Sequence, residues 1–362
     1  MTIQVMRDYK HLCKHKHQVF LYGTHDSDDH FDQIQSYTED SGINILQRHG
    51  STRWNRNLLR GHLFYKMIKD RSHKVVISRN YNKMKEALAL KPLLGKVSYF
   101  LELHEDAFPH LLKNKKISSE VIKARYEKLF EKIDGLILTN YSQELILKQE
   151  FSTVPPYSVL PNGVEIANFS QAATPKNSQD KFFLTYTGQF TQWKNLELLF
   201  AALAKLDSRF YLRIAGGKGD QASKDLIAHW GDKHGVGSRI EYLGFLSQKE
   251  LISKALDGSS ALLLSLGDNM ESRYFTSPMK LFEYMATKIP IVAVNYPSVN
   301  LISGTDSVFL SPNDPVAFAE KIKEAVLGNE VKQRITAMNK IAAKYCYTTR
   351  SERFNNFLAS AV

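Results

Sequence analysis

The sequence predicts an α/β protein made of two similarly built lobes. Short apolar runs rich in β-branched and aromatic residues alternate with amphipathic stretches of helical length, which is the pattern of parallel strands joined by helices. The alternation stops at the polar stretch 170–181 and then starts again. The length of 362 residues agrees with this division, because one domain usually takes about 100–200 residues.

The first half of the chain holds strand candidates that are short, apolar and bounded by polar or turn-forming residues. They lie at 18–23, 43–47, 74–78, 97–103, 136–139 and 157–160. Between them the spacing of apolar residues indicates helices at 6–16, 55–70, 82–90 and 119–132. We expect these elements to form an N-terminal domain over residues 1–168.

The second half repeats the pattern and is expected to form a C-terminal domain over residues 169–345. Strands are predicted at 182–187, 210–215, 240–243, 261–265, 291–294 and 308–310. Helices are predicted at 195–206, 221–234, 248–256, 279–286 and from residue 315 onward. Open parallel sheets bind ligands at the carboxyl ends of their strands, so the residues just after each strand carry the functional information.

Composition excludes several classes of protein. Hydrophobic residues make up 43% and charged residues 23%, which is ordinary globular usage. The longest apolar runs, such as 261–264, are far shorter than the about 18 residues of a membrane-spanning helix. Residues 1–8 show no signal-peptide pattern, and Cys13 and Cys346 are too few for a disulfide framework. We therefore expect a cytoplasmic protein.

Charge is the unusual feature of the composition, because 48 Lys and Arg against 37 Asp and Glu leave a net charge of +11. Residues 50–132 contain 19 basic and 8 acidic residues, a difference of +11 that equals the net charge of the whole chain. Such an excess suits nucleic acid, an anionic membrane surface or a negatively charged substrate. A solvated basic face that only aids solubility is the alternative interpretation.

Nucleic acid is the least supported of these partners, and we expect none to bind. The basic stretch 50–132 shows no helix-turn-helix spacing, no zinc-finger spacing and no aromatic stacking motif. An anionic membrane surface or an anionic substrate therefore remains as the expected partner of the basic residues.

The segment 274–286, with the sequence YFTSPMKLFEYMA, is the densest functional signal. Thr276 or Ser277 can cap a helix whose first residue would be Pro278. The free N–H groups of the first turn favour an anion, and Lys280 adds a positive charge where helix stability alone prefers an acid. Glu283 lies about one turn further on, where it can accept hydrogen bonds from sugar hydroxyls. The alternative is an ordinary capped helix with Glu283 in solvent.

This segment resembles the donor-nucleotide motif of the retaining glycosyltransferases with the GT-B fold, of the large bacterial group-1 or family 4 type. Further segments are similar to those of the same family in the same order. They are LELHE at 101–105, LPNGV at 160–164, YTGQF at 186–190 with WKN at 193–195, and the segments 210–217, 242–245 and 261–265. The resemblance covers nearly the whole chain and is strongest over residues 181–295.

The resemblance implies a GT-B fold, in which two Rossmann-like, doubly wound domains face a cleft. The N-terminal domain would receive the acceptor and the C-terminal domain the nucleotide-sugar donor, and a last helix at about 346–362 would pack back on the first domain. The implied reaction is a hexosyltransferase-type transfer, with retention, from a nucleotide diphosphate sugar to a hydroxyl of a glycan or lipid-linked acceptor. A UDP- or GDP-sugar is the expected donor, without a metal or another cofactor. The implied setting is surface polysaccharide biosynthesis, with peripheral attachment to the inner face of the cytoplasmic membrane.

The resemblance also implies roles for individual residues. His104, at the end of a predicted strand, would contact the donor sugar and stabilise the transition state. Lys194 and Lys280 would hold the diphosphate with backbone amides at the start of the predicted helix, and Glu283 would bind the ribose. The implied catalytic residues are His104, Lys194 and Glu283, and the implied donor-binding residues are Gly188, Gln189, Lys194, Gly216, Phe245, Ser277, Pro278, Met279, Lys280, Leu281 and Glu283.

Three features of the chain depart from the family pattern. Gln189 stands where the family usually has an arginine, and Phe275 stands where many members have an acid eight residues before the second carboxylate. The chain also lacks the family's opening glycine-rich loop, because a predicted helix at 6–16 comes almost directly at the start. Lys280 and the helix terminus would compensate for the missing arginine.

Two other functions remain open on the residues alone. One is a nucleotide-sugar epimerase with a similar two-lobed architecture, and the other is a protein that binds nucleotide sugars without catalysis. The run Asp26–Asp29, flanked by His25 and His30, is also compatible with a divalent-cation site, but a charged loop after a strand is common. The glycine-rich run 216–219 lacks the spacing of a phosphate-binding fingerprint and is interpreted as a loop lining the cleft.

Overall fold

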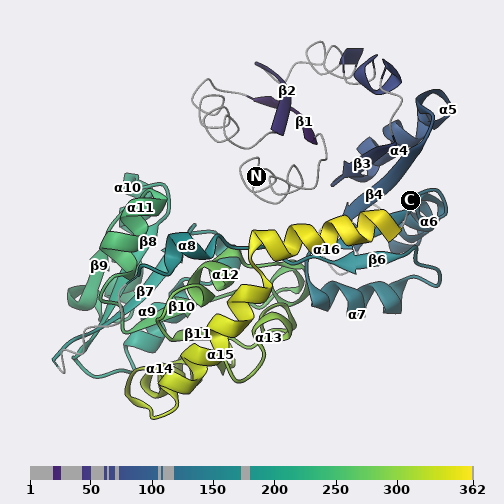
Figure 1. Ribbon diagram of the computed structural model, residues 1–362. Coiled ribbons are helices and arrows are strands. Elements are labelled where there is room, and N and C mark those ends of the chain that lie inside the picture. Colours follow the sequence, from purple (N-terminus) through teal and green to yellow (C-terminus); the bar gives the residue numbers. More distant parts are fainter. Residues whose placement is uncertain are drawn as a thin grey trace. The chain divides into compact units, whose positions relative to one another are not determined.

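The computed structural model describes residues 19–25, 43–49, 61–62, 65–69, 73–104, 107–108, 118–172 and 180–360 (Figure 1). The chain divides into two compact units. Unit 1 comprises Met1–Thr139, Leu147–Pro161 and Tyr347–Val362, and unit 2 comprises Asn140–Ile146 and Asn162–Cys346. The division after Pro161 comes earlier than the boundary we expected after residue 168, and the short segment Asn140–Ile146 is grouped with unit 2.

Unit 1 contains a four-stranded parallel sheet in the order β3-β4-β5-β6. The strands are β3 (Lys74–Ser78), β4 (Val97–Leu103), β5 (Gly135–Leu138) and β6 (Tyr157–Val159). All seven residues of β4 and all four of β5 are buried, as expected for central parallel strands covered on both faces. A separate parallel pair, β1 (Val19–His25) and β2 (Ile43–His49), places Val19 opposite Ile43.

Helices α4 (Tyr81–Ala89), α5 (Lys91–Leu94), α6 (Ser119–Phe130), α7 (Tyr141–Glu150) and α16 (Tyr347–Ser360) accompany this sheet. Local sequence explains where two of them begin. The Asn80 side chain accepts a hydrogen bond from the Lys83 N–H, and Ser118 accepts one from the Val121 N–H. The predicted helix at 6–16, and residues 55–60, 63–64 and 70 of the predicted helix at 55–70, lie outside the described residues.

The C-terminal helix α16 is part of the core of unit 1. Phe354 and Leu358 are buried with Phe100 of β4, and Phe357 meets Phe100 edge to face with ring centroids 5.4 Å apart. A Cβ atom at Gly135 would lie 2.8 Å from the Phe357 ring, so β5 needs a glycine where the helix crosses it. A segment from the end of the sequence thus completes a sheet built from its first half.

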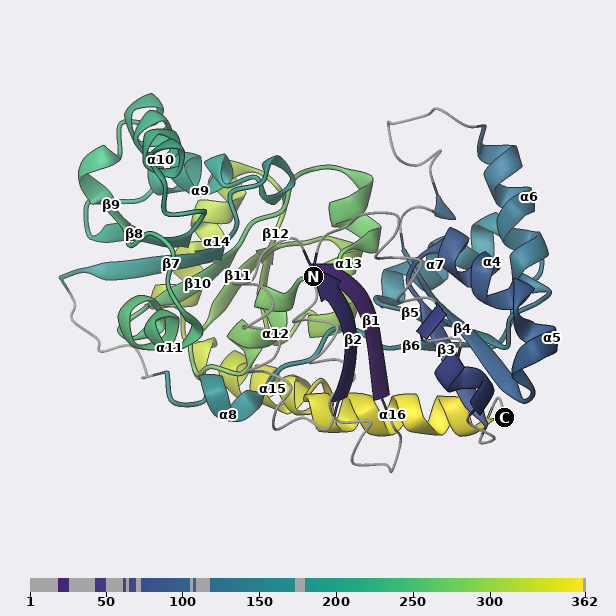
Figure 2. The ribbon, with the colours of Figure 1, turned by 90° about the horizontal axis from the view of Figure 1, so that it is seen from above.

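Unit 2 contains a six-stranded parallel sheet in the order β12-β11-β10-β7-β8-β9 (Figure 2). The strands are β7 (Phe182–Gly188), β8 (Phe210–Gly216), β9 (Ile240–Tyr242), β10 (Ala261–Leu264), β11 (Ile291–Val294) and β12 (Phe309–Ser311). The strand order runs one way from β7 through β9 and the other way from β10 through β12. The topological switch point therefore lies between β7 and β10, where open α/β sheets bind their ligands.

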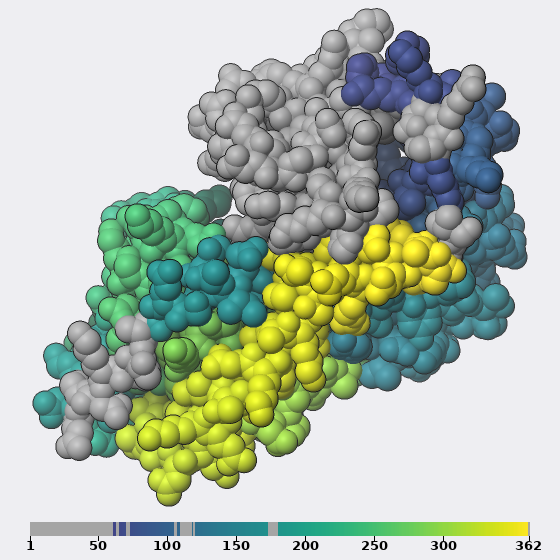
Figure 3. Space-filling model, in the orientation of Figure 1, coloured from purple at the N-terminus to yellow at the C-terminus, as the bar shows by residue number. Residues whose placement is uncertain are grey.

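Helices cover both faces of this sheet. Helices α9 and α14 pack against each other and against the sheet, and α12 packs on β10 and contacts α8 and α15. Helices α14 and α15 form part of the surface of unit 2 (Figure 3). The helices of unit 2 are α8 (Ile166–Phe169), α9 (Glu197–Leu203), α10 (Gln221–Lys233), α11 (Gln248–Glu250), α12 (Met279–Met285), α13 (Pro297–Ser303), α14 (Pro315–Leu327) and α15 (Val331–Lys344).

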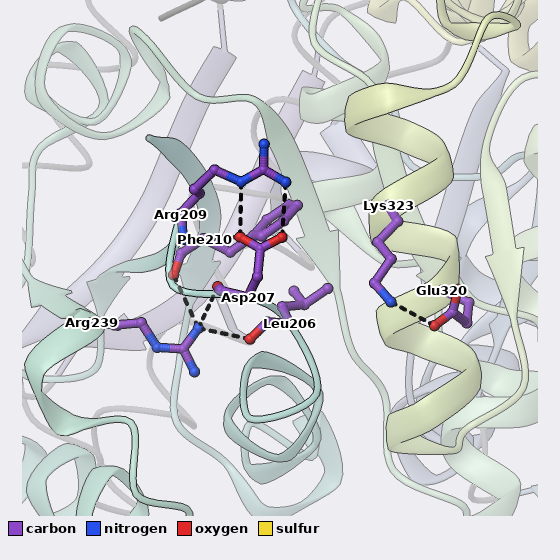
Figure 4. A network of polar contacts seen from close by, with 7 residues as sticks. All are labelled: Leu206, Asp207, Arg209, Phe210, Arg239, Glu320 and Lys323. Atoms are coloured by element: carbon purple, nitrogen blue, oxygen red, sulfur yellow. Dashed lines mark hydrogen bonds and ion pairs between the residues drawn. The ribbon is translucent and has the colours of Figure 1, made fainter. Parts of the chain in front are cut away.

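The loop between α9 and β8 is fixed by one arginine (Figure 4). Arg239 donates to the carbonyls of Leu206, at 3.2 Å, and Asp207, at 2.9 Å. Arg209 adds a bidentate contact with the Asp207 carboxylate, at 3.0 and 2.9 Å. The two bonds from Arg239 help to satisfy backbone carbonyls of the loop that precedes β8.

Within the described ranges, no helix is both long and apolar enough to cross a bilayer. This finding agrees with the absence of a long apolar run in the sequence.

The carboxyl ends of β7 and β8 meet at two glycines. The Gly217 N–H donates to the Gly188 carbonyl at 3.0 Å, and the Gly216 N–H donates to the Gly244 carbonyl at 2.7 Å. A Cβ atom at Gly216 would lie 1.8 Å from the Gly188 oxygen, and Gly216 has a φ of 140°. Only glycine allows this approach, because a side chain would both clash and strain the backbone.

We predict that Gly216→Ala destabilises the folded protein by about 3 kcal/mol, through the clash with the Gly188 carbonyl and through the positive φ. Gly235→Ala is the matched control, because Gly235 also has a positive φ, of 65°, but no atom lies within 4 Å of its Cβ position. The control should lose only about 1 kcal/mol. Urea unfolding followed by circular dichroism measures both changes, and equal losses would contradict the close-approach argument.

Candidate functional site

The candidate site of unit 2 lies at the carboxyl ends of its strands, next to the switch point. The loop after β7 is held by contacts with a tyrosine of β7 and a tyrosine of β9. The Tyr186 hydroxyl donates to the Gln189 carbonyl at 3.0 Å, and the Phe190 ring lies 5.8 Å from the ring of Tyr242. Tyr242 in turn donates to the Gly216 carbonyl at 3.0 Å. The side chain of Gln189 remains exposed on this braced loop.

Phe245 follows β9 and is the most exposed large hydrophobic residue in the described part of the chain, at 66%. The preceding Gly244 has a φ of 71°, which turns the chain sharply at the strand end. An exposed aromatic ring beside a glycine-rich strand edge offers a flat apolar face to a ligand.

Lys194 ends a short 3₁₀-helix, Gln192–Lys194, that is tied to the loop after β10. The Trp193 carbonyl accepts hydrogen bonds from the Gly267 N–H, at 2.7 Å, and from the Ser272 hydroxyl, at 3.2 Å. Asn195 follows with a φ of 46°, the one positive φ outside glycine among the described residues. Its side chain donates to Asn313 at 3.0 Å, which holds the strained turn in place.

The ammonium of Lys194 is poorly stabilised by the protein alone. Its Nζ atom lies 3.7 Å from the centroid of the Trp193 ring. Burial and, to a smaller extent, the nearby charge of Lys280 together lower the pKa of Lys194 to about 8. Both causes penalise the charged form, so an anion placed beside the two lysines would relieve both.

Helix α12 differs from the sequence prediction at its start. Pro278 is the N-cap residue, and the first helical residue is Met279. Neither Thr276 nor Ser277 caps the helix with its side chain, because the Ser277 hydroxyl accepts a hydrogen bond from the Asn162 N–H at 3.0 Å. Asn162 also donates from its side chain to the Ser277 carbonyl at 2.6 Å. The Asn-Gly turn at 162–163 therefore holds the loop that precedes α12.

Leu281, one of the residues expected to bind the donor, has its backbone amide paired within the helix. The Leu281 N–H donates to the Pro278 carbonyl at 2.9 Å. The expected role of Leu281 in donor binding stays a prediction. Met279 remains at the helix start, where backbone N–H groups have no partner within the helix.

Asn140 and Ser142 also fix the loop before α12, and sequence reasoning did not single them out. Asn140 donates from its side-chain amide to the carbonyls of Thr276, at 2.5 Å, and Ser298, at 2.9 Å. The Ser142 hydroxyl donates to the Tyr274 carbonyl at 2.6 Å. Both are fully buried. These bonds explain why Asn140–Ile146 is grouped with unit 2, and no local pattern in the sequence indicates them.

Lys280 and Glu283 form an ion pair on α12, with 2.6 Å between Nζ and Oε2. Glu283 is only 8% exposed, so the alternative that placed it in solvent is wrong. The pair keeps a buried carboxylate neutralised. The two side chains are thus side by side, and Lys280 is close enough to Lys194 to affect its pKa.

Tyr284 joins α12 to the end of β7. Its hydroxyl oxygen accepts a hydrogen bond from the Thr187 N–H at 2.8 Å and lies 2.9 Å from the Thr187 hydroxyl. Burial raises the pKa of Tyr284 well above its usual range, so the phenol stays neutral. This contact sets the distance between the Gly188 loop and the Lys280–Glu283 pair.

The burial of two further residues at this edge, Phe275 and Ser265, indicates what each of them can do. Phe275, which stands where the resemblance led us to expect an acid, is 5% exposed and is therefore a packing residue. Ser265, directly after β10, is fully buried, and its hydroxyl has no hydrogen-bond partner within the described residues. A buried hydroxyl without a partner beside a switch point is a group that a ligand could satisfy.

In unit 1, His104 directly follows β4 and meets two charged residues. Its Nε2 atom lies 3.0 Å from the Glu102 carboxylate and 3.1 Å from Nε of Arg79, and Arg79 lies 2.8 Å from the same carboxylate oxygen. Glu102 is 3% exposed and His104 is partly exposed. The strand-end position of His104 is as predicted, whereas the partnership with Arg79 was not anticipated, because Arg79 follows a different strand.

The candidate cation site at 25–30 falls almost entirely outside the described residues, where only the backbone of His25 is placed, in β1. Among the side chains that the structure does describe, no group of three or more His, Cys, Asp or Glu residues could hold a metal ion.

The second half of the chain is similar in sequence to a known family. Residues 168–341 match the model of the family described as Glycosyl transferases group 1. No curated protein matches the chain in sequence.

Solved structures extend the likeness over the whole chain. HepE from Anabaena, in complex with UDP, has a TM-score of 0.76 at 13% identity, with 99% of this chain and 96% of HepE covered. Sucrose-phosphate synthase from Thermosynechococcus elongatus has a TM-score of 0.74 at 14% identity, covering 99% and 92% of the chains. The lipopolysaccharide outer core galactosyltransferase WaaB has a TM-score of 0.60 at 17% identity, covering 91% and 87%. At these identities the likeness shows the fold, which is the α/β fold of the GT-B glycosyltransferases.

Proposed function

We propose that this protein is a retaining glycosyltransferase that moves a sugar from a nucleotide diphosphate sugar to a hydroxyl of a glycan or lipid-linked acceptor. The observation that carries the proposal is the pair Lys194 and Lys280 at the switch point of unit 2, which is similar to the group 1 glycosyltransferases. Lys194 is partly buried beside a second cation, with its pKa lowered to about 8, which is the environment that an anionic ligand would stabilise. A diphosphate supplies that charge.

In the proposed donor complex, the diphosphate lies between Lys194 and Lys280 and near the start of α12. Lys280 then shares its charge between the ligand and Glu283, which is 2.6 Å away. Glu283 accepts hydrogen bonds from the ribose hydroxyls while keeping Lys280 as a partner. Gly188 and Gly216 allow the ligand to approach the backbone, and the exposed ring of Phe245 offers a face to the base.

The leaving diphosphate accumulates negative charge as the glycosidic bond breaks. Two fixed lysines in a desolvated site stabilise that charge more strongly than water would, without having to reorganise during the reaction. This charge stabilisation is the reason we propose a metal-independent reaction. In the same proposal His104 contacts the donor sugar and stabilises its transition state, and the configuration of the anomeric carbon is retained.

Turnover assays test the reaction class. With an acceptor extract, we expect the protein to release free nucleoside diphosphate only when donor and acceptor are both present. UDP-sugars are tested before GDP-sugars, since HepE is known in complex with UDP. Isomerised donor without transfer would instead identify an epimerase, and nucleotide binding without turnover would identify a non-catalytic binder. Either result contradicts the transferase.

Nucleotide affinity tests the donor site. Lys194→Ala should weaken UDP or GDP binding by about tenfold to a hundredfold, because a charge-assisted contact with the diphosphate is lost.

The affinity of the unmodified protein for the nucleotide should fall about tenfold between pH 7 and pH 9, because Lys194 loses its proton as the pH rises through its pKa of about 8. Lys194→Arg keeps its charge over this range, so its affinity should stay constant. Isothermal titration calorimetry measures the nucleotide affinity of the unmodified protein, of Lys194→Ala and of Lys194→Arg.

Glu283→Ala should also strongly weaken the binding of UDP or GDP. Glu250→Ala and Lys254→Ala are matched controls, since these residues form a comparable ion pair of 3.0 Å on the exposed surface of the same unit. Neither control should change the affinity by more than about twofold. Affinity close to that of the unmodified protein in both Lys194→Ala and Glu283→Ala would overturn the assignment of the site.

We further propose that the protein works in surface polysaccharide biosynthesis, in the cytoplasm, bound peripherally to the inner face of the membrane. The support is the basic excess of residues 50–132. Within the described part of that stretch, Lys85 and Lys96 are exposed, and Leu93 is 63% exposed. Exposed lysines and an exposed apolar side chain suit an anionic lipid surface.

Vesicle flotation tests this attachment. We expect more protein to float with vesicles containing anionic lipid than with neutral vesicles, and the difference to shrink at high salt. The double variant Lys85→Glu, Lys96→Glu should reduce binding. The double variant Lys332→Glu, Lys340→Glu, which changes two exposed lysines of α15, should bind normally. Equal flotation with neutral and anionic vesicles at moderate salt would remove the electrostatic argument.

A further inference from the structure

Trp193 and Lys194 are neighbours in the short 3₁₀-helix after β7, and their side chains contact each other. The Nζ atom of Lys194 lies over the Trp193 ring, 3.7 Å from its centroid. The negative face of an aromatic ring attracts a cation in this position, and tryptophan is the strongest of the aromatic partners. The indole ring is therefore a group that can hold the charge of Lys194.

No acidic side chain takes this role. Among the described residues, the ammonium of Lys194 forms no hydrogen bond and no ion pair. Lys280, the cation whose charge acts on Lys194, has a carboxylate of its own, because Glu283 lies 2.6 Å from its Nζ atom. Burial and the charge of Lys280 both disfavour the Lys194 cation, so the ring opposes two unfavourable effects.

The other charged groups on the elements next to this turn are also engaged elsewhere or exposed. On the loop after β10, Asp268 and Arg273 pair with each other at 2.6 Å, and Glu271 is exposed. On α9, Glu197 pairs with Lys233 at 2.7 Å. None of these groups is a cause of the low pKa of the site lysine. The aromatic ring is thus its one stabilising partner in the described part of the chain.

The backbone on both sides of this contact is fixed. The Trp193 carbonyl accepts hydrogen bonds from the Gly267 N–H, at 2.7 Å, and from the Ser272 hydroxyl, at 3.2 Å. A Cβ atom at residue 267 would lie 3.2 Å from the same carbonyl oxygen. Asn195 follows in the left-handed conformation and donates to Asn313 at 3.0 Å. The ring and the ammonium are therefore presented together by one fixed turn.

An aromatic partner differs from a carboxylate in what it leaves for a ligand. The carboxylate of Glu283 neutralises Lys280. The indole face stabilises the Lys194 cation but carries no net charge, so the positive charge remains available to an anion. Trp193 is 38% exposed and Lys194 is partly exposed, so an anion can reach the pair without opening the core.

We infer that Trp193 is a positioning residue that holds the ammonium of Lys194 over its ring, charged and without a neutralising acid, for an anionic ligand. The inference rests on the proposed function for the identity of that ligand, the diphosphate of the donor. The contact between the ring and the ammonium can be measured without any nucleotide.

The first test measures the pKa of Lys194 by the Cε shifts of ¹³C-lysine-labelled protein, assigned with Lys194→Arg. Trp193→Leu keeps an apolar cover but removes the aromatic face, so the pKa should fall by about one pH unit. Trp193→Phe keeps an aromatic face and should recover part of the fall. Trp230→Leu is the matched control and should leave the pKa unchanged, since the Trp230 ring packs on Phe200, with centroids 5.6 Å apart.

The sign of the change separates two roles of the ring. If Trp193 only shielded Lys194 from water, its removal would raise the pKa toward the ordinary value of a lysine. Incorporation of 5-fluorotryptophan isolates the electrostatic contribution, because fluorine withdraws electron density from the ring and nearly keeps its shape. The label should lower the pKa of Lys194 in the otherwise unmodified protein and leave it unchanged in Trp193→Phe.

The pH profile of nucleotide affinity supplies the second readout. If the pKa of Lys194 falls from about 8 to about 7, the charged fraction at pH 8 falls from half to about a tenth. Trp193→Leu should therefore bind UDP or GDP about fivefold more weakly at pH 8 and within twofold of the unmodified protein at pH 6. A purely structural role would weaken binding equally at both pH values.

Each result decides the inference. An unchanged or raised pKa of Lys194 in Trp193→Leu, or a loss of affinity that is the same at pH 6 and pH 8, would overturn it. If Trp193→Leu does not fold, as judged by circular dichroism, the fluorinated protein decides, and an unchanged pKa then overturns the inference. If the protein binds no nucleotide, the proposed function fails, and the lysine spectra alone still confirm or overturn the role of Trp193.

Discussion

The contact between the carboxyl ends of β7 and β8 is the constraint on which the candidate site depends. The Gly188 oxygen occupies the place where a side chain at residue 216 would begin, at 1.8 Å from the Cβ position. Residue 216 must therefore be glycine, and the loops after the two strands run close together at the switch point. Tyr284 then fixes α12 against the same strand end through Thr187. The lysines of the site are placed by this backbone arrangement.

The charges of the side chains at the site determine which kind of ligand it favours. Lys280 and Glu283 neutralise each other on α12, whereas Lys194 is held in a desolvated turn beside a second cation. A site of this kind is stabilised by an anionic ligand, because the ligand supplies the charge that the protein lacks. The cluster in unit 1 has the opposite balance. There a buried carboxylate is surrounded by cations, and the protein itself satisfies its charge.

Sequence patterns predicted most of the elements, because the periodicity of apolar residues follows directly from which faces are buried. The ends of β7, β8, β10 and β11 lie within one residue of the expected positions. Helix α13 (Pro297–Ser303) was not predicted, since it is short, and it is held by tertiary contacts such as the bond from Ser298 to the Ser272 carbonyl. Ser277 was a reasonable N-cap residue by spacing, but Asn162 competes for its hydroxyl from 115 residues away.

The sequence by itself determined the α/β class and the two-lobed organisation, because apolar periodicity is a local signal. The start of a helix singled out Lys280 and Glu283 as candidates, and the family resemblance added Lys194. Tertiary structure alone decided which groups meet. The charge of Lys280 beside Lys194 and the meeting of Arg79 with Glu102 and His104 depend on side chains from different elements. Desolvation and charge pairing arise only when the fold excludes water and brings those elements together, and no local pattern in the chain encodes them.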